Sequence, residues 1–391
     1  MVIVNPRLSG NANVVPDFAK SVRRGKSNLT AIDNHLAQIS MSAMHSRYEH
    51  PSAWTGEDMQ RRTDWVLQLD HQDNVLLHRA VLQARRRGLG IPHLKAADLD
   101  LGRLASKLAW LRAEVAMRRG FVLVRGFDID RYSLEDAALA YWAVGTHLGS
   151  GTAQNAQGDV LGHVTNIGVD FRTDPRARGY QSKLRLPFHN DGQDVVGLLC
   201  LHPAQSGGES LIVSSTTVYN EVLRLRPDLM AVAHQNFCLD RRGEAPVGKA
   251  PWYAGPLFNR VGEVLFCRYN RTYIESAQRF DDVPRLSGQQ VELLDLIDRL
   301  CSDPRLCLSM ELQRGDMQFI SNYTVLHSRT QYEDGPDPAK RRYLLRLWLD
   351  TGLFDELPAS FADRYEDIRQ WQLKPQAPIF DLAHVHTELA H

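Results

Sequence analysis

The sequence predicts a mainly β protein, a sandwich or barrel with flanking helices outside it and a largely helical segment in front of it. Between residues 151 and 349, short runs of β-branched and aromatic residues follow one another, separated by turn residues. Such runs are typical of strands. Residues 74–119 instead carry apolar residues at three- and four-residue spacing, the pattern of amphipathic helices. Many short strands with few helices among them favour packed sheets.

The first part of the chain is expected to be largely helical. Residues 1 to about 70 are polar and show only weak periodicity. In order, the expected elements are a helix at 31–44, a helix from Asn74 that stops before Gly88, a helix at 101–119 that Gly120 ends, a strand at 121–127 and a helix at 134–148. Ser133 followed by Asp136 resembles the box that starts a helix.

The strand-rich part follows. Its runs predict strands at 161–169, 183–189, 195–201, 210–215, 263–269, 308–312, 316–322 and 341–349. Helices are expected at 216–226, which Pro227 ends, and at 288–301, where Ser287 can cap the first turn. The tail at 361–391 is expected to be a mixed helix and loop extension.

Composition excludes several classes of function. The 46 Lys and Arg residues balance 46 Asp and Glu residues, whereas binding to nucleic acid usually needs a basic excess or stripe. No window approaches the ~20 apolar residues of a membrane helix, and the N-terminus lacks the pattern of a signal peptide. The five cysteines are widely spaced without a CxxC pair, which favours free thiols in a reducing compartment. We therefore expect a cytoplasmic protein without nucleic-acid or membrane partners.

Of the fifteen histidines, three begin a His-x-Asp or His-x-Glu triplet, and only one has a convincing context. His71-x-Asp73 lies at the entry to a helix, where an N-cap is the simpler role, and His386-x-Glu388 lies in the terminal residues. His189-x-Asp191 ends the alternating run 183–189 and precedes Gly192. Period-two geometry places His189 and Asp191 on one face, with Arg185, as a facial metal site requires.

A distant histidine and an arginine-bearing strand complete the candidate site. His327 follows a strand and an apolar approach, which makes it the strongest candidate for a third ligand. The run 341–349 places Arg342 and Arg346 on one face of an otherwise apolar strand. Buried arginines are costly unless each meets an anion. Solvated arginines or internal ion pairs are the alternative explanation.

In these motifs the chain resembles the TauD/TfdA (taurine dioxygenase-like) family of Fe(II)- and 2-oxoglutarate-dependent oxygenases. The resemblance rests on His189-x-Asp191, Gly192, Gly207-Gly208-Glu-Ser210, Gly315-Asp316, the approach to His327 and the RRYLLR segment. It covers about 230 residues and implies a double-stranded β-helix, or jelly-roll, catalytic domain at 121–350. Residues 1–120 would form a largely helical N-terminal extension, and residues 351–391 a helix and loop extension.

Carried over to this chain, the resemblance implies roles for seven residues. His189, Asp191 and His327 would bind Fe(II), and Arg342 would hold the distal carboxylate of the cosubstrate 2-oxoglutarate. Ser210 stands where relatives often have a threonine that reaches the same carboxylate. Arg346 matches a position that meets the anionic group of the substrate, and Arg185 matches a substrate contact, although a solvated strand end explains Arg185 equally well.

The implied reaction uses O2 and 2-oxoglutarate to oxidise a C–H bond of a small, anionic organic substrate, releasing succinate and CO2. Hydroxylation, desaturation and cyclisation are all compatible with it. Two alternatives stay open: a non-catalytic small-molecule-binding jelly roll, and a zinc hydrolase that uses the same three ligands. The paired arginines favour the oxygenase. The N-terminal 120 residues could roof the pocket, form the interface of a homo-oligomer or recognise a carrier.

Overall fold

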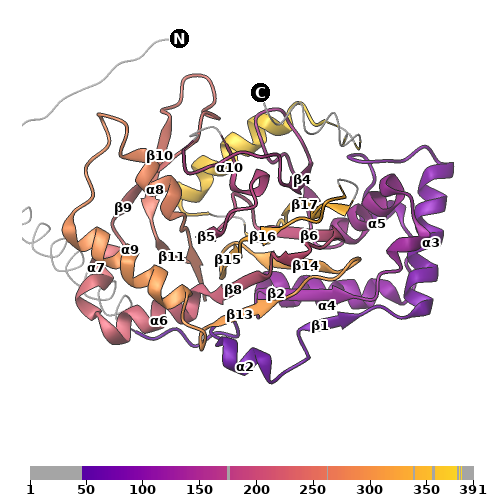
Figure 1. The fold of residues 1–391 in the computed structure, drawn as a ribbon, viewed down its shortest axis with the longest axis horizontal. Coiled ribbons are helices and arrows are strands. Elements are labelled where there is room, and N and C mark those ends of the chain that lie inside the picture. Colours follow the sequence, from indigo (N-terminus) through magenta and orange to yellow (C-terminus); the bar gives the residue numbers. More distant parts are fainter. Residues whose placement is uncertain are drawn as a thin grey trace, which may run out of the picture. The chain divides into compact units, whose positions relative to one another are not determined.

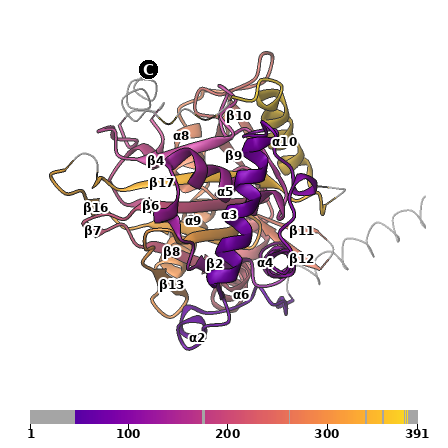
Figure 2. The ribbon, with the colours of Figure 1, turned by 90° about the vertical axis from the view of Figure 1, so that its right-hand side faces the viewer.

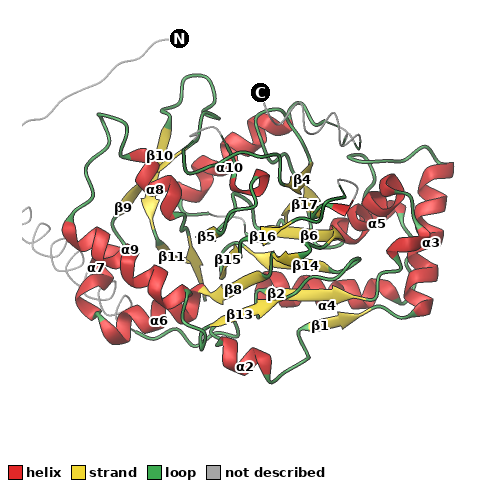
Figure 3. Ribbon diagram, in the orientation of Figure 1, coloured by secondary structure: helices red, strands yellow, loops and turns green. Residues whose placement is uncertain are grey.

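The computed structural model of the chain describes residues 46–173, 177–261, 263–337, 340–354, 357–376, 378 and 380. The chain divides into a unit of Met1–Ser46 and a compact unit of Arg47–His391, and the helices and strands of the described residues lie in the second unit. The helix expected at 31–44 lies outside the described residues. In the compact unit, strands form the middle and helices surround them (Figure 1, Figure 3).

The larger of the two main sheets has seven strands. Their order is β1-β2-β14-β6-β17-β3, and β4 also pairs with β17. The strands are β1 (Val66–Gln68), β2 (Phe121–Arg125), β3 (Ser150–Gly151), β4 (Leu161–Thr165), β6 (Val195–His202), β14 (Met317–Ser321) and β17 (Tyr343–Asp350). Apart from the parallel β1–β2 pair, neighbouring strands of this sheet are antiparallel. Their pairing places segments that are far apart in the sequence side by side.

The smaller main sheet has the order β13-β8-β15-β5. It contains β5 (Leu186–His189), β8 (Ser210–Ser214), β13 (Cys307–Met310) and β15 (Val325–Arg329). Three further antiparallel pairs are β7 (Ser206–Gly207) with β16 (Tyr332–Glu333), β9 (Asn236–Asp240) with β10 (Trp252–Pro256), and β11 (Phe258–Val261) with β12 (Val264–Cys267). Two facing sheets of this kind make the double-stranded β-helix that the sequence predicts.

In the described part of the chain, nine helices surround the sheets. They are α2 (Gly56–Gln60), α3 (His71–Arg86), α4 (Leu104–Met117), α5 (Leu134–Thr146), α6 (Ser215–Leu225), α7 (Met230–Ala233), α8 (Arg271–Ala277), α9 (Gly288–Cys301) and α10 (Ala359–Gln372). Of these, α3, α4 and α5 cover the outer face of the large sheet, while α6, α7 and α9 cover that of the small sheet. Figure 2 shows α3 lying across the large sheet, and Figure 1 shows α6, α7 and α9 on the opposite side of the molecule.

The apolar core follows these layers. One cluster joins α3, α4 and α5 to the outer face of the large sheet, and a second joins α6, α7 and α9 to the small sheet. A third lies between the two sheets and contains Phe121, Val196, Ile212, Ile320, Val325 and Trp348. Residues 47–120 thus share a core with the strands that follow them. At about 25 cal/mol per Å² of buried apolar area, these layers supply the main stabilising free energy.

The helices that were predicted from a capping residue and from apolar periodicity are confirmed. Ser133 accepts a hydrogen bond from the Asp136 backbone at 3.2 Å and starts α5, and Ser287 does the same for Gln290 at the start of α9. The strand expected at 183–189 is shorter, because only Leu186–His189 pairs with β15. The hairpins β9–β10 and β11–β12 were largely missed, because only β12 carries a clear apolar run.

A candidate metal centre between the two sheets

Two histidines face each other on the small sheet. His189 at the end of β5 and His327 on β15 are register partners in an antiparallel pair, and their ring centroids are 4.3 Å apart. Side chains directly opposite each other in such a pair lie on the same face. Strand pairing alone therefore brings together two imidazoles that lie far apart in the sequence.

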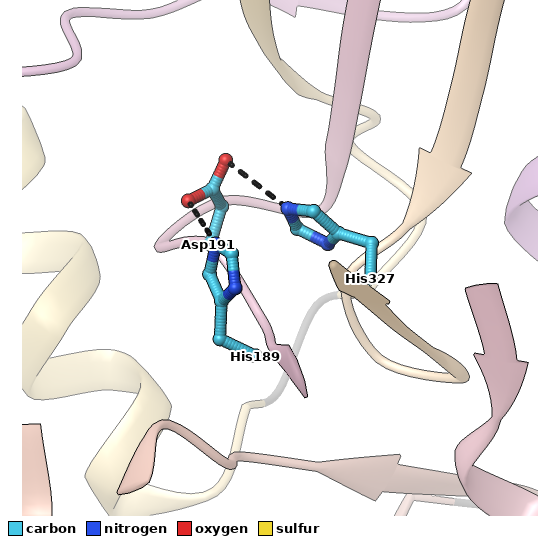
Figure 4. A group of neighbouring side chains, drawn as sticks. All are labelled: His189, Asp191 and His327. Atoms are coloured by element: carbon cyan, nitrogen blue, oxygen red, sulfur yellow. Dashed lines mark ion pairs between the residues drawn. The ribbon is translucent and has the colours of Figure 1, made fainter. Parts of the chain in front are cut away.

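Asp191 completes the group from the turn after β5. Its Oδ1 lies 3.9 Å from His189 Nε2 and its Oδ2 lies 4.0 Å from His327 Nε2 (Figure 4). One ligand atom from each of the three residues lies within 4.8 Å of the others, a spacing that a single metal ion can bridge. Because β5 ends at His189, the position of Asp191 does not come from strand alternation.

The turn that carries Asp191 is held by hydrogen bonds from two other segments. The Asp191 backbone N–H donates to Asn322 Oδ1 at 3.0 Å, and the Asn322 amide donates to the Gln193 carbonyl at 2.8 Å. The Asp191 carbonyl accepts from Arg268 Nη1 at 3.2 Å. Buried polar groups satisfied in this way hold a single conformation, so the carboxylate is aimed before any ligand binds.

Both imidazoles can offer a lone pair on Nε2. His189 Nδ1 lies 2.9 Å from the Pro187 carbonyl, which can only accept, so the proton sits on Nδ1 and Nε2 is free. Burial, together with neighbouring His189, lowers the pKa of His327 to about 3, so this ring is neutral. Two neutral imidazoles and one carboxylate fit the donor set of a non-haem Fe(II) site.

The carboxylate of Asp191 is ionised and also contacts the large sheet. Its Oδ2 accepts from Trp348 Nε1 at 3.0 Å and lies 3.5 Å from Arg346 Nη1, both on β17. Burial raises the pKa of Asp191, but Arg346 and the two histidines outweigh it and bring the pKa down to about 2. The candidate metal centre therefore lies between the sheets, anchored on both.

Arg342 lies just before β17, is 5% exposed and lines the same cavity as the metal-binding group. Its Nη1 is buried and has no hydrogen-bond partner among the described residues. Its guanidinium lies 5.0 Å from the centre of the Tyr332 ring. A buried guanidinium with an unpaired N–H group is costly until an anion reaches it, so Arg342 suits a carboxylate of a bound ligand.

Arg329 also lines the cavity, and the sequence analysis did not predict a role for it. Its guanidinium lies 4.6 Å from the centre of the Tyr332 ring, and its Nη1 is also buried without a partner in the described part of the chain. Arg329 follows His327 by two residues on β15, so strand alternation puts both on one face. That spacing could have revealed it.

Of the other three predicted residues, Ser210 and Arg346 line the cavity and Arg185 does not. Ser210 is buried in the cavity wall, and its hydroxyl donates to Gln318 Oε1 at 2.8 Å. Arg346 also lines the cavity, where its guanidinium lies 4.5 Å from the Tyr180 ring centre. Arg185 is exposed, precedes β5 and is not among the residues that line the cavity. The structure therefore does not bring Arg185 to the candidate metal centre.

The cavity beside the metal-binding group has a volume of about 150 Å³. Besides Arg329, three further arginines that the sequence analysis did not predict line it from separate segments, Arg178, Arg268 and Arg364, together with Glu244. No local sequence pattern distinguishes these arginines from the many surface arginines of the chain. Only the folded arrangement shows that they face the site.

A jelly-roll fold with a His/Asp/His group and a buried arginine beside it defines the class of non-haem iron oxygenases. The model of the family described as "Taurine catabolism dioxygenase TauD, TfdA family" matches residues 87–348. The chain belongs to the TauD/TfdA family. It is an Fe(II)- and 2-oxoglutarate-dependent dioxygenase. Membership of this family decides against the two alternatives, a zinc hydrolase and a non-catalytic binding protein.

The chain is similar to two curated proteins in sequence and to a solved structure in fold. The chain is 28% identical over 333 residues to FR-33289 synthase of Streptomyces rubellomurinus, covering 83% of this chain and 95% of that protein. It is 26% identical over 334 residues to a taurine hydroxylase-like protein of Stachybotrys chartarum, covering 83% and 85%. An asparagine oxygenase solved with Fe(II), hydroxyasparagine and succinate aligns with a TM-score of 0.57 at 16% identity, covering 73% of this chain and 94% of that one. This last likeness concerns the fold.

Two further expectations can be compared with the described residues. All five cysteines are free, as their spacing predicted. Within the described ranges, no helix is long and apolar enough to cross a membrane.

Proposed function

We propose that His189, Asp191 and His327 are the Fe(II) ligands of this dioxygenase. The observation that carries the proposal is the convergence of two imidazoles and one carboxylate, each with a ligand atom within 4.8 Å of the others. When bound, Fe(II) and 2-oxoglutarate supply the chemistry, since O2 decarboxylates 2-oxoglutarate to succinate and CO2 and a substrate C–H bond is oxidised. The three ligand residues would hold the ion, and the cavity beside them would take the cosubstrate and the substrate.

Arg342 is assigned to the distal carboxylate of 2-oxoglutarate. The unpaired Nη1 of this buried residue supports the assignment, because a guanidinium–carboxylate contact fixes orientation as well as affinity. Ser210 is assigned to the same carboxylate. Its hydroxyl has one proton, which now points to Gln318 Oε1. Turning the Gln318 amide would let the amide donate to Ser210 and free the hydroxyl for the cosubstrate.

The substrate is proposed to be a small organic anion that contacts Arg346. The Arg346 guanidinium lines the cavity beside the metal-binding carboxylate, and its Nε donates to Gln154 Oε1 at 2.8 Å. When Asp191 shares its charge with a metal ion, Arg346 is left with charge to offer a substrate. Hydroxylation is the simplest outcome, and desaturation or cyclisation would use the same residues.

Anaerobic addition of Fe(II) and 2-oxoglutarate tests the ligand assignment. The wild-type protein should develop a weak visible charge-transfer band, and exposure to O2 should then release succinate. Asp191→Ala should abolish both, whereas Asp170→Ala, which removes a surface carboxylate paired with Arg172, should change neither. An Asp191→Ala protein that kept the band and the succinate would overturn the assignment. Hydrolysis by the Zn(II)-loaded protein without O2 would support the hydrolase instead.

A further inference from the structure

Three arginines and one glutamate form a charged wall of the cavity, and none of the four is among the residues proposed to contact iron, cosubstrate or substrate. We call Arg178, Arg268 and Arg364 the arginine cluster. Glu244 Oε2 lies 2.6 Å from Arg178 Nη2 and 4.0 Å from Arg364 Nη2, so one carboxylate oxygen serves two guanidinium groups. All four residues line the cavity that contains the metal-binding group.

The arginine cluster borders the turn that carries Asp191. Arg268 Nη1 donates to the Asp191 carbonyl at 3.2 Å, and its guanidinium lies 4.2 Å from the centre of the Phe361 ring on α10. Arg364, one turn further along α10, has its Nε 3.3 Å from the point where a Cβ on Gly192 would lie. A group bound by the cluster would therefore lie next to the metal centre.

Among the described residues, the positive charge of this wall is not fully balanced by carboxylates. Arg268 is 4% exposed and pairs with no carboxylate among the described residues, and its Nε has no partner there either. Asp367, which lies 3.4 Å from Arg364 Nη1, also pairs with Lys249 at 3.0 Å and with Arg241. The negative charge of Asp367 is therefore already balanced by Lys249 and Arg241. Three cluster arginines against Glu244 leave two positive charges in a buried wall, which is unfavourable without a counter-ion.

We propose that the arginine cluster binds a dianionic tetrahedral group of the substrate, a phosphate monoester or a phosphonate. This inference rests on the proposed function and names the class of its substrate. A dianion would neutralise the two excess charges, whereas a carboxylate would neutralise one. Planar guanidinium groups suit phosphate-type oxygens because they donate two parallel hydrogen bonds. Helix α10, which follows the last strand of the jelly roll, would then help to recognise the substrate through Arg364.

Calorimetric titration with propyl phosphate and pentanoate, which are matched in length, tests the proposal. The protein is loaded anaerobically with Fe(II) and 2-oxoglutarate at about pH 8, where a phosphate monoester carries both charges. Propyl phosphate should bind at least about tenfold more tightly than pentanoate, and it should perturb the visible band. Equal affinities, or no binding of propyl phosphate, would overturn the proposal. A missing band in the wild-type protein would instead count against the ligand assignment, because calorimetry reports phosphate binding independently.

Two variants and one control separate the charge argument from a general structural effect. Arg364→Gln should weaken propyl phosphate by at least about tenfold and pentanoate by much less. Glu244→Gln should tighten propyl phosphate, since it removes the competing anion, and a purely structural role of Glu244 would not do this. Arg369→Gln changes an exposed arginine on the same helix and should leave both affinities unchanged. If Arg364→Gln weakened both probes equally and Glu244→Gln weakened propyl phosphate, the proposal would be wrong.

Discussion

His327 lies directly opposite His189 in the antiparallel pairing of β15 with β5. This register decides whether the chain has a metal centre. A slip of one residue in either strand would turn one imidazole to the opposite face of the sheet. The register is held from both sides, because β15 also pairs with β8 along five residues. Ser328 strengthens the pairing with β5, since its hydroxyl donates to the Leu186 carbonyl at 2.5 Å.

Asn322→Ala should lower the affinity for Fe(II) by about tenfold, because residues that orient metal ligands typically contribute about 10- to 100-fold. The substitution leaves the Asp191 N–H without its acceptor and the Gln193 carbonyl without its donor. Metal competition with a fluorescent chelator would measure the change. Asn259→Ala, which removes one hydrogen bond to Pro256 away from the cavity, is the control. Equal Fe(II) affinity in the two variants would contradict the positioning role.

Arg342→Gln should raise the dissociation constant for 2-oxoglutarate at least about 30-fold, because removing one partner of a buried charge pair costs about 2 kcal/mol or more. The anaerobic visible band, titrated with 2-oxoglutarate, gives this constant directly. Arg346→Gln should affect it much less and should instead raise the KM for substrate once one is known. If Arg346→Gln cost more 2-oxoglutarate affinity than Arg342→Gln, the two assignments would have to be exchanged.

Ser210 provides a finer test of cosubstrate binding. Ser210→Ala should weaken 2-oxoglutarate about tenfold, since a hydrogen bond to a charged group contributes about 1.5 kcal/mol. Ser210→Thr keeps the hydroxyl and should stay within about threefold of the wild type. The same titration of the visible band measures both variants. If Ser210→Ala bound 2-oxoglutarate as tightly as the wild type, Ser210 would serve only to hold Gln318.

Metal and cosubstrate should stabilise the folded protein. With each ligand at about 100 times its dissociation constant, the free energy of unfolding should rise by about 2.7 kcal/mol per ligand. Thermal unfolding with Mn(II), used in place of Fe(II) to avoid oxidation, would show a higher Tm that EDTA reverses. His189→Ala should lose the increase caused by Mn(II). A His189→Ala protein with an undiminished increase would show that the metal binds elsewhere.

The packing of α10 against β10 depends on a glycine. A Cβ added to Gly255 would lie 2.1 Å from the Cβ of Ser360 on α10, so Gly255→Ala should destabilise the protein by about 1–3 kcal/mol through overpacking. Gly288→Ala, at the start of α9 with open space around it, should be neutral or slightly stabilising because alanine favours the helix. Denaturant unfolding compares the two. Equal stability of both variants would mean that α10 can shift freely.

The sequence by itself determined the features that depend on neighbours a few residues away. Serine caps, apolar spacing and β-branched runs located α5, α9, β2, β6 and β17, because hydrogen bonds and side-chain faces within one element follow from local geometry. The His189-x-Asp191 spacing also gave the right pair, although through a turn and not through strand alternation. Arg185, judged by that same alternation, proved to lie outside the cavity wall.

Only the tertiary structure decided which distant groups meet. The pairing of β15 with β5 brought His327 to His189, and the facing of the two sheets brought Arg346 and Trp348 to Asp191. The arginine cluster comes from a loop, the residue after β12 and the C-terminal helix. No local pattern separates these arginines from solvated ones, because their significance lies in burial and unbalanced charge. Those two properties exist only once the sheets and helices have packed.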